Sequence, residues 1–343
     1  MSLKRNVLQE ISQTLDIILK KIDQENNDYL SGMRLDKKQK KLLLEAMENF
    51  EKKLQAFWIR QKIEYLKIMK KLPELIKKDL KKVYKVKKAI LSEEYENQLI
   101  EIITGFIFVN EEAEIDQLAA LYLSFSNSFF AEFAKLCACS VKNSRFEPNQ
   151  GLSQKAIDWI DQHKIKFATK VNQTTQDTIT QSLKESLSKG IGTLSAGNKL
   201  VSDVPNHFNQ NTHNEKSKKL SKIIDAKTYN MLYQSIEQQQ CFEFYRARRI
   251  ARTETISAMN AATLEGWRQS KVVQGKEWLC SCDHRSRLWH KEANGQKVAL
   301  EESFIVGGEK MLHPGDSSLG ASAENVIHCR CTMKSILNYQ MRR

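Results

Sequence analysis

Residues that interrupt helices are scarce in this chain. Its 343 residues include only 4 prolines and 13 glycines. Proline breaks or kinks a helix and glycine weakens one, so their scarcity favours long helices over a sheet with many turns. Over much of residues 3–140, apolar residues recur at three- and four-residue steps, as in Val7, Leu8, Ile11 and Leu15. This spacing gives one apolar stripe per helix and predicts a helical bundle or a set of helical arms.

Local signals predict where individual helices end. One helix is expected to run from about residue 40 to Pro73, since proline commonly ends a helical pattern. A second helical block covers residues 152–192 and is expected to stop at Gly190 and Gly192. A further long helix is expected over residues 244–270, where apolar and small residues keep the helical spacing.

The sequence predicts three regions. Residues 1–145 form a basic, helical amino-terminal region, and residues 150–240 form a helical middle region. Within the middle region, residues 195–221 are polar and indicate a loop. Residues 241–343 change to a pattern of one helix followed by short strands. The expected fold class is therefore mainly α, with helical amino-terminal and middle regions and a small C-terminal α+β domain.

The charge of the chain narrows the choice of partners. A formal net charge of +13 favours nucleic acid, an anionic membrane surface or an acidic protein. Between Arg60 and Lys88, 12 basic residues stand against 3 acidic ones. Such a cluster gains affinity for a phosphate backbone by releasing counterions, without reading the base sequence, whereas a solvated helix face is the simpler alternative. The candidate nucleic-acid contacts are Lys70, Lys71, Lys77, Lys78, Lys81, Lys82, Lys85, Lys87 and Lys88.

Neither a secretory signal nor a membrane span is expected. The amino terminus carries charges throughout, and the most apolar segment, residues 117–131, is shorter than the ~18–20 apolar residues that a span needs. The seven cysteines are placed locally and do not form a framework along the whole chain. These features predict an intracellular protein with mostly reduced thiols.

The helix expected over residues 244–270 carries two charged residues of interest, Arg252 and Glu254. Because they stand two positions apart, they do not share a helix face, and each is expected to have its own partner. Buried charges are tolerated only when paired, so they are expected to attach this helix to the domain that follows. Small residues predict close packing of the same helix; they are Ala251, Ser257, Ala258, Ala261 and Ala262.

Short strands are expected beyond this helix, over residues 276–283, 304–306 and 325–333, with a turn at Asn294 and Gly295. Residues two apart on a strand face the same side. Each Cys-x-Cys pair is therefore expected to present both thiols on one face, either toward a metal or as small apolar side chains.

Cysteine and histidine are concentrated in this last region. Four of the seven cysteines and four of the seven histidines lie within 52 residues near the carboxyl end. Thiolates and imidazoles are the ligand types that zinc prefers, although Cys-x-Cys pairs are less diagnostic than Cys-x-x-Cys. The candidate metal ligands are His290, Cys329 and Cys331, completed by Asp283, Cys280 or Cys282. The alternative is a reduced, hydrogen-bonded cluster around a small sheet.

Patterns that indicate catalysis are weak, and no enzymatic activity is expected. The His-x-Glu and Pro-Cys-x-x-Cys halves of zinc deaminases are absent, and so is His-Glu-x-x-His. The glycines of 306-VGGEK-310 lack the frame of a phosphate-binding loop. A Cys–His nucleophile pair stays open as an alternative, because such partners meet in space and not in sequence.

Four sequence blocks mark the C-terminal region: RARRIARTETISAMNAATLEGW, DHRSRLWHKEANGQ, ESFIVGGEKMLHPGD and SAENVIHCRC. In order and spacing, these blocks resemble the phage Mu F-like head morphogenesis (minor capsid) proteins. The resemblance is specific over residues 246–333 and looser back through residues 171–190, whereas residues 1–140 match nothing specific. It implies that residues 241–343 form a Mu F-like α+β domain.

The resemblance also points to individual positions. Those that match the pattern of the family are Arg252, Thr253, Glu254, Trp278, Asp283, Arg285, Arg287, His290, Asn294, Gly295, Phe304, Pro314, Gly315, Asp316, Cys329, Arg330 and Cys331. His328 departs from the family, which usually has asparagine there, and it either adds a ligand or replaces a hydrogen bond. Cys280 and Cys282 are not part of the usual pattern, which weakens a zinc role for those two thiols.

The resemblance implies a protein built into the phage head in few copies, associated with portal, capsid and scaffold proteins. Such a protein assists head assembly and DNA packaging or ejection; it is found in the virion, in the host cytoplasm during assembly, and not in a membrane. Two alternatives stay open: a metal-dependent enzyme that uses the Cys/His cluster, and a sequence-independent DNA-binding module. The crowded C-terminal residues are expected to clasp a small domain that has too little apolar core.

Overall fold

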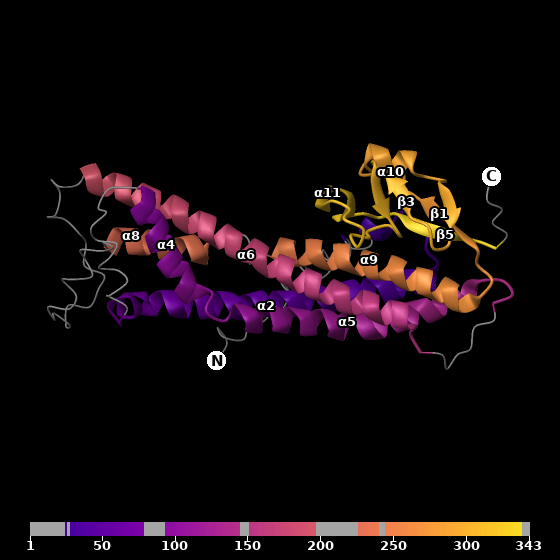
Figure 1. Cartoon of the computed structure of the whole chain (residues 1–343), viewed down its shortest axis with the longest axis horizontal. Coiled ribbons are helices and arrows are strands. Elements are labelled where there is room, and N and C mark those ends of the chain that lie inside the picture. The colour runs from indigo at the N-terminus through magenta and orange to yellow at the C-terminus, as the bar shows by residue number, and fades with distance from the viewer. Residues whose placement is uncertain are drawn as a thin grey trace, which may run out of the picture. The chain divides into compact units, whose positions relative to one another are not determined.

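The computed structural model describes residues 25, 28–78, 93–144, 151–196, 226–239 and 244–337. The long elements are helices: α2 (Lys37–Lys78), α4 (Glu93–Ile107), α5 (Glu111–Ser140), α6 (Gln154–Ala196), α8 (Ala226–Glu237) and α9 (Phe244–Ser270). The short elements follow: β1 (Gly275–Leu279), α10 (Leu288–Glu292), β2 (Lys297–Ala299), β3 (Phe304–Val306), β4 (Glu309–Met311), α11 (Ala323–Val326) and β5 (Thr332–Ile336) (Figure 1). The expected fold class, mainly α with a small C-terminal α+β part, is confirmed.

Helix α9 covers the expected residues, but two other helices run past the residues that were predicted to end them. Helix α2 continues beyond Pro73 to Lys78, and α6 continues through Gly190 and Gly192 to Ala196. A proline inside a helix costs about 3 kcal/mol and a glycine about 1 kcal/mol, so each weakens a helix without necessarily ending it. The predicted helix near the amino terminus, and residues 197–221 of the expected loop, lie outside the described residues.

The chain divides into two compact units. The first is made of Met1–Lys52, Leu121–His163 and Ala247–Arg343, and the second of Lys53–Ala120 and Lys164–Arg246. Helices α2, α5, α6 and α9 each contribute residues to both units. Each compact unit is built from separate segments of the chain. The three consecutive regions expected from the sequence therefore do not coincide with these units, and their boundaries stay a prediction.

The second unit has an apolar core. Its side chains come from α2, α4, α6 and α8; they are Tyr65, Met69, Leu72, Leu99, Ile100, Ile103, Ile107, Ile179, Leu183, Leu232 and Ile236. A half-buried carboxylate lies within the same unit, where Glu114 accepts hydrogen bonds from Tyr65 Oη at 2.8 Å and Gln61 Nε2 at 2.9 Å. Burial raises the pKa of the Glu114 carboxyl above its ordinary value.

Close packing of α9 in the first unit agrees with the small residues along it. The expected small residues are all buried. Gly266 marks the nearest approach, because a Cβ atom added there would lie 2.2 Å from the backbone oxygen of Ala134 in α5. Real Cβ atoms do not approach oxygen this closely, so only glycine fits between the two helices.

Two small antiparallel sheets complete the first unit. One has the strand order β2-β1-β5, with β1 paired to β5 from Gly275 opposite Ile336 to Leu279 opposite Thr332. The other is the β3-β4 hairpin. Its turn is made by residues 307–308, two glycines with φ of 59° and 82°, the left-handed values that a two-residue hairpin turn requires. The glycine pair of VGGEK therefore forms a hairpin turn.

The strand expected over residues 304–306 is confirmed, but the other two were misplaced. Strand β1 ends at Leu279, before the first Cys-x-Cys pair, and the stretch 325–333 contains the end of α11 and a turn before β5 begins. Cys282 and His328 have φ of 53° and 57°, left-handed values that interrupt a strand. The common face expected for the first pair is also wrong, since Cys280 is buried and Cys282 exposed.

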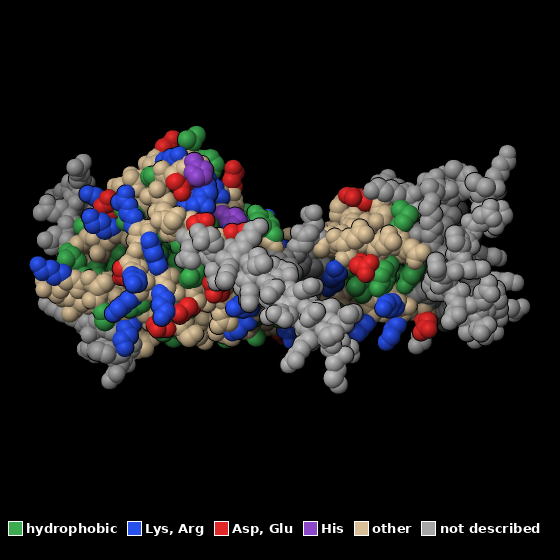
Figure 2. Space-filling model, turned by 180° about the vertical axis from the view of Figure 1, so that it is seen from behind, with side chains coloured by type: hydrophobic (Ala, Val, Ile, Leu, Met, Phe, Trp, Pro, Cys, Tyr) green, Lys and Arg blue, Asp and Glu red, His purple; other side chains and the backbone are tan. Residues whose placement is uncertain are grey.

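Basic side chains are spread over the surface in several groups, with acidic side chains between them on the face shown in Figure 2. Of the lysines proposed to contact nucleic acid, Lys70 and Lys71 are exposed on α2. Lys77 and Lys78 continue the same helix, and their side chains are not described. Outside the described residues lie Lys81, Lys82, Lys85, Lys87 and Lys88. Among the described helices, none is both long and apolar enough to cross a membrane.

Candidate functional site

Arg252 and Glu254 of α9 have separate partners, as their spacing predicts. The Arg252 guanidinium carbon lies over the Tyr29 ring, 4.7 Å from its centroid, and Glu254 Oε2 is 2.7 Å from His163 Nε2. Tyr29 and His163 both precede α9 in the chain. These two contacts attach α9 to earlier segments of the chain, and the expected attachment to the domain that follows stays a prediction.

Thr253, between those two residues, is the one that reaches the following domain. Its hydroxyl oxygen accepts a hydrogen bond from the backbone N–H of His328 at 3.2 Å. The His328 ring packs edge-on against Tyr29, with centroids 5.9 Å apart. Burial and the surrounding arginines lower the pKa of His328 to about 4, so its imidazole is neutral at pH 7. Its φ of 57° is left-handed, a conformation that histidine and asparagine adopt more often than most other residues with a side chain.

Asp283 is held in an ion pair. Its Oδ1 accepts hydrogen bonds from Arg330 Nη2 at 2.5 Å, Ser286 Oγ at 3.1 Å and the backbone N–H of Arg285 at 3.0 Å. The hydrogen bond from Arg330 is the main reason why the pKa of Asp283 lies well below its usual range. This carboxylate is therefore ionised and already engaged by a cation.

Two more arginines of the same loop bind backbone carbonyl groups. Arg285 Nη2 donates to the carbonyl oxygen of Asp28 at 3.1 Å, and Arg287 Nη2 donates to that of Ile327 at 2.5 Å. A guanidinium can bridge several acceptors in one plane, which suits it to joining separate loops. These arginines connect residues 283–287 to two distant segments of the first unit.

The expected turn at residues 294–295 is present and supports the end of β1. Gly295 has a φ of 82° and donates its N–H to the carbonyl oxygen of Trp278 at 2.9 Å. Asn294 Oδ1 accepts the backbone N–H of Cys280 at 2.9 Å. Trp278 is fully buried and packs edge-on against His290, with centroids 5.8 Å apart. The turn thus fixes the position of Cys280 relative to His290.

The segment that contains Pro314 and Asp316 forms a closed loop. Asp316 accepts the backbone N–H groups of Leu312 and Ser318 at 2.9 and 2.8 Å. The Pro314 carbonyl accepts a hydrogen bond from Asn260 Nδ2 of α9 at 3.1 Å. These residues of the family pattern therefore hold the loop in shape and attach it to α9.

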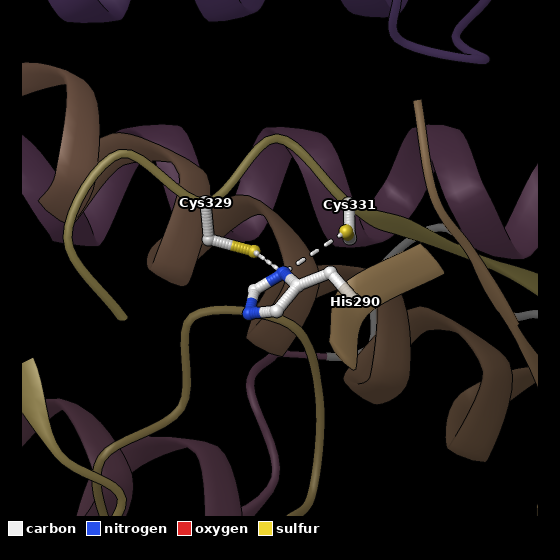
Figure 3. A group of neighbouring side chains, drawn as sticks. All are labelled: His290, Cys329 and Cys331. Carbon is white, nitrogen blue, oxygen red and sulfur yellow. Dashed lines mark hydrogen bonds between the residues drawn. The ribbon is translucent and has the colours of Figure 1, made fainter. Parts of the chain in front are cut away.

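His290, Cys329 and Cys331 come together in the interior of the first unit (Figure 3). His290 Nδ1 lies 3.4 Å from Cys331 Sγ and 3.8 Å from Cys329 Sγ, and all three side chains are at most 3% exposed. The other ring nitrogen, Nε2, faces the Oδ1 acceptor of Asn325 at 2.9 Å. A proton on Nε2 satisfies this bond and leaves the Nδ1 lone pair directed at the two sulfurs.

Asn325 is the residue that the sequence reasoning missed. Its Oδ1 also accepts a hydrogen bond from Trp289 Nε1 at 2.7 Å, and its Nδ2 donates to the Val306 carbonyl at 3.0 Å and to Glu309 Oε2 at 2.6 Å. Four bonds use nearly all the capacity of one amide and fix its orientation. Its only sequence signal is its place in the SAENVIHCRC block, because its partners lie far away in the chain.

Cys280 adjoins the cluster, whereas Asp283 and Cys282 lie outside it. The Cys280 thiol interacts with that of Cys331, and this contact lowers the pKa of Cys280 to about 5. The Cys280 sulfur also accepts the backbone N–H of Cys282 at 3.1 Å. Two of the candidate ligands therefore do not belong to the cluster: Asp283 forms an ion pair with Arg330, and Cys282 is exposed on the surface.

Comparison with known proteins supports the resemblance. Residues 177–334 match the family described as "Phage Mu protein F like protein". This match contains the four C-terminal blocks and the whole of α8 and α9, together with the end of α6. The resemblance to Mu F-like phage proteins is therefore confirmed for this part of the chain.

Two curated proteins are similar to the chain. Over 337 residues it is 21% identical to the "Uncharacterized protein YqbB" of Bacillus subtilis (strain 168), covering 97% of this chain and 92% of that protein. Over 146 residues it is 25% identical to the "NAD(+)--arginine ADP-ribosyltransferase EFV" of Enterococcus faecalis (strain ATCC 700802 / V583). That second match covers 42% of this chain and only 29% of the relative. No solved structure gave a significant match.

Proposed function

We propose that this chain, whose residues 177–334 are Mu F-like, is a minor head protein of a tailed phage or prophage. It associates with the portal and with capsid or scaffold proteins and assists head morphogenesis. The family match is the observation that carries the proposal. The described structure supports it, because the positions shared with the family make contacts inside the first unit and so maintain a fold.

The proposed role is not catalytic. A catalytic zinc site keeps one coordination position open to substrate, whereas the side chains of His290, Cys329 and Cys331 are buried. The transferase activity in the name of the Enterococcus relative is a statement about that protein, of which the match covers 29%.

Co-assembly tests the proposal. The chain is expressed with its cognate portal, scaffold and coat proteins, and heads are separated by sedimentation. We expect it to travel with the heads at a low, fixed ratio to the coat protein. Omitting the portal is the control, and the chain should then leave the heads if the portal recruits it. A chain that stays at the top of the gradient in the complete mixture refutes the role in the head.

DNA contact is a further part of the proposed role, supported by the net charge of +13 and by the exposed Lys70 and Lys71. The double variant Lys70→Gln/Lys71→Gln should weaken binding to duplex DNA of any sequence and reduce its dependence on salt. Lys41→Gln/Lys52→Gln removes the same charge from exposed positions elsewhere on α2 and is the matched control. Equal losses in both variants would contradict a role for this particular cluster.

A further inference from the structure

We propose that Cys280, His290, Cys329 and Cys331 bind one Zn²⁺ ion in a closed tetrahedral site. The site would stabilise the fold and carry no substrate. This inference goes beyond the role in head assembly and does not depend on it, because it rests on the placement of these side chains.

The distances between ligand atoms fit a tetrahedral zinc ion. Zinc–sulfur and zinc–nitrogen bonds of about 2.3 and 2.05 Å place a sulfur and a nitrogen ligand roughly 3.6 Å apart across a tetrahedral angle. The observed separations from His290 Nδ1 are 3.4 Å to Cys331 and 3.8 Å to Cys329. The three ligand atoms all lie within 4.8 Å of one another. Only small side-chain shifts are needed to place one ion between them.

The histidine is oriented as a metal ligand. Metal-binding imidazoles almost always donate the N–H of their second nitrogen to a fixed acceptor, which sets the tautomer and the ring plane. Asn325 Oδ1 provides that acceptor at 2.9 Å from Nε2. The amide cannot turn around, because its Nδ2 donates to Val306 and Glu309. A hydrogen bond between histidine and cysteine alone would not require this second set of contacts.

We assign Cys280 as the fourth ligand. Its sulfur does not belong to the group of three ligand atoms that lie within 4.8 Å of one another, so it would have to move toward them. Its side chain is 1% exposed, and its thiol interacts with that of Cys331. Its sulfur also accepts a hydrogen bond from the backbone N–H of Cys282 at 3.1 Å. Backbone N–H bonds to a ligand sulfur are typical supporting contacts that stabilise a thiolate. Cys282 is exposed, and Asp283 is held by Arg330. Neither competes for the position without breaking an existing contact.

The site would join three short segments of the C-terminal region. Cys280 follows β1, His290 lies in α10, and residues 329–331 lie between α11 and β5. The strands in this region are only 3 to 5 residues long. A structural zinc site contributes its binding free energy to folding, which suits a small domain of this kind.

The first experiment is elemental analysis of the full chain, purified with a reductant and without chelators. We expect about one zinc per chain. X-ray absorption at the zinc edge should show three sulfur atoms at about 2.3 Å and one nitrogen at about 2.0–2.1 Å. Replacement by Co²⁺ should give the intense visible bands of a tetrahedral thiolate site. A reduced, folded chain that holds no zinc and gives no such cobalt spectrum overturns the proposal, as does a disulfide between these cysteines.

Two variants test the choice of the fourth ligand. Cys280→Ser should weaken zinc binding at least tenfold and leave a metal shell with two sulfurs. Cys282→Ser changes the same residue type two positions away and should retain the wild-type metal content and spectrum. The opposite pattern, with metal lost in Cys282→Ser and kept in Cys280→Ser, overturns the assignment. The zinc content and the spectra of the wild-type chain test the site itself. That test does not depend on whether either variant folds.

Discussion

The core of the second unit and the C-terminal region, residues 275–337, are stabilised by different kinds of contact. The core of the second unit consists of aliphatic and aromatic side chains. The C-terminal region buries polar and charged side chains beside its apolar ones; the polar and charged ones are Lys276, His290, His313, Asp316, Asn325, Arg330 and Thr332. Apolar contacts have no fixed direction and tolerate exchange, whereas a buried polar group depends on one particular partner.

This difference explains the density of family positions in the C-terminal region. A helical core of the second unit's kind can be built from many combinations of apolar residues with the same spacing. In the C-terminal region, replacing a single donor or acceptor leaves its partner buried without a hydrogen bond. The comparison therefore predicts unequal tolerance to substitution, and each of the following changes tests it.

The largest effect is expected for Asn325→Leu. The substitution keeps the branched shape of the side chain but removes four hydrogen bonds, leaving Trp289, His290 and Val306 without this partner. At 1–3 kcal/mol for each buried unsatisfied group, the free energy of unfolding should fall by about 4 kcal/mol or more. Urea unfolding followed by near-ultraviolet circular dichroism measures it. A loss below about 1 kcal/mol would mean that this region tolerates exchange as an apolar core does.

Leu183 provides the counterpart in the second unit, where its side chain is fully buried. Leu183→Ala should cost roughly 2–5 kcal/mol through the cavity that it leaves. Leu183→Met keeps the volume and should cost less than about 1.5 kcal/mol. Thermal and urea unfolding of both variants measure the ratio. If the methionine variant is as unstable as the alanine variant, the core does not tolerate exchange between apolar side chains of similar volume, contrary to our inference.

Lys276 tests the cost of burying a charge. It is fully buried, its Nζ donates to the Leu312 carbonyl at 2.8 Å, and burial lowers its pKa to about 8. Between pH 8 and about 10.5 the unfolded chain binds more protons at this lysine than the folded chain, so stability rises with pH. Relative to Lys276→Met, the wild type should gain about 3 kcal/mol across this range. A constant difference between the two proteins contradicts the lowered pKa.

Two helical glycines give the smallest and opposite effects. Gly266→Ala places a Cβ against the backbone of Ala134 and should destabilise the first unit by roughly 1–3 kcal/mol. Gly105 in α4 is exposed and has nothing within 4 Å of an added Cβ. Gly105→Ala should therefore stabilise the second unit by about 0.5–1 kcal/mol through better helix propensity. Thermal unfolding of each variant checks the sign, and equal signs would refute close packing at Gly266.

The helices were predictable because their signal is local. Apolar spacing identified α9 over its whole length, and small residues along it indicated close packing. Helix ends were predicted less well, since Pro73 and Gly190 interrupt the pattern without ending the helices. One glycine or proline inside a helix costs only about 1–3 kcal/mol relative to alanine, and the remaining hydrogen bonds of a long helix outweigh this cost.

The strands and the Cys/His cluster were harder to predict. For the strands, the alternation of apolar and polar residues continues past the point where each strand ends. The left-handed conformations at Cys282 and His328 have no clear signature in a non-glycine residue. His290 and the second Cys-x-Cys pair were identified as neighbours from residue type alone. Asn325 was missed because its partners lie 16 to 36 positions away, and only the folded chain brings them together.

The contacts of residues 252–254 of α9 can form only in a certain order during synthesis of the chain. Two of their partners, Tyr29 and His163, leave the ribosome before α9 itself does. The third contact, from Thr253 to His328, spans 75 positions toward the carboxyl end. A growing chain can therefore assemble the helices of this unit early, but the turn of α9 at Thr253 stays incomplete until residue 328 has been synthesised. Nascent chains that stall before that point would expose a helix made to be buried.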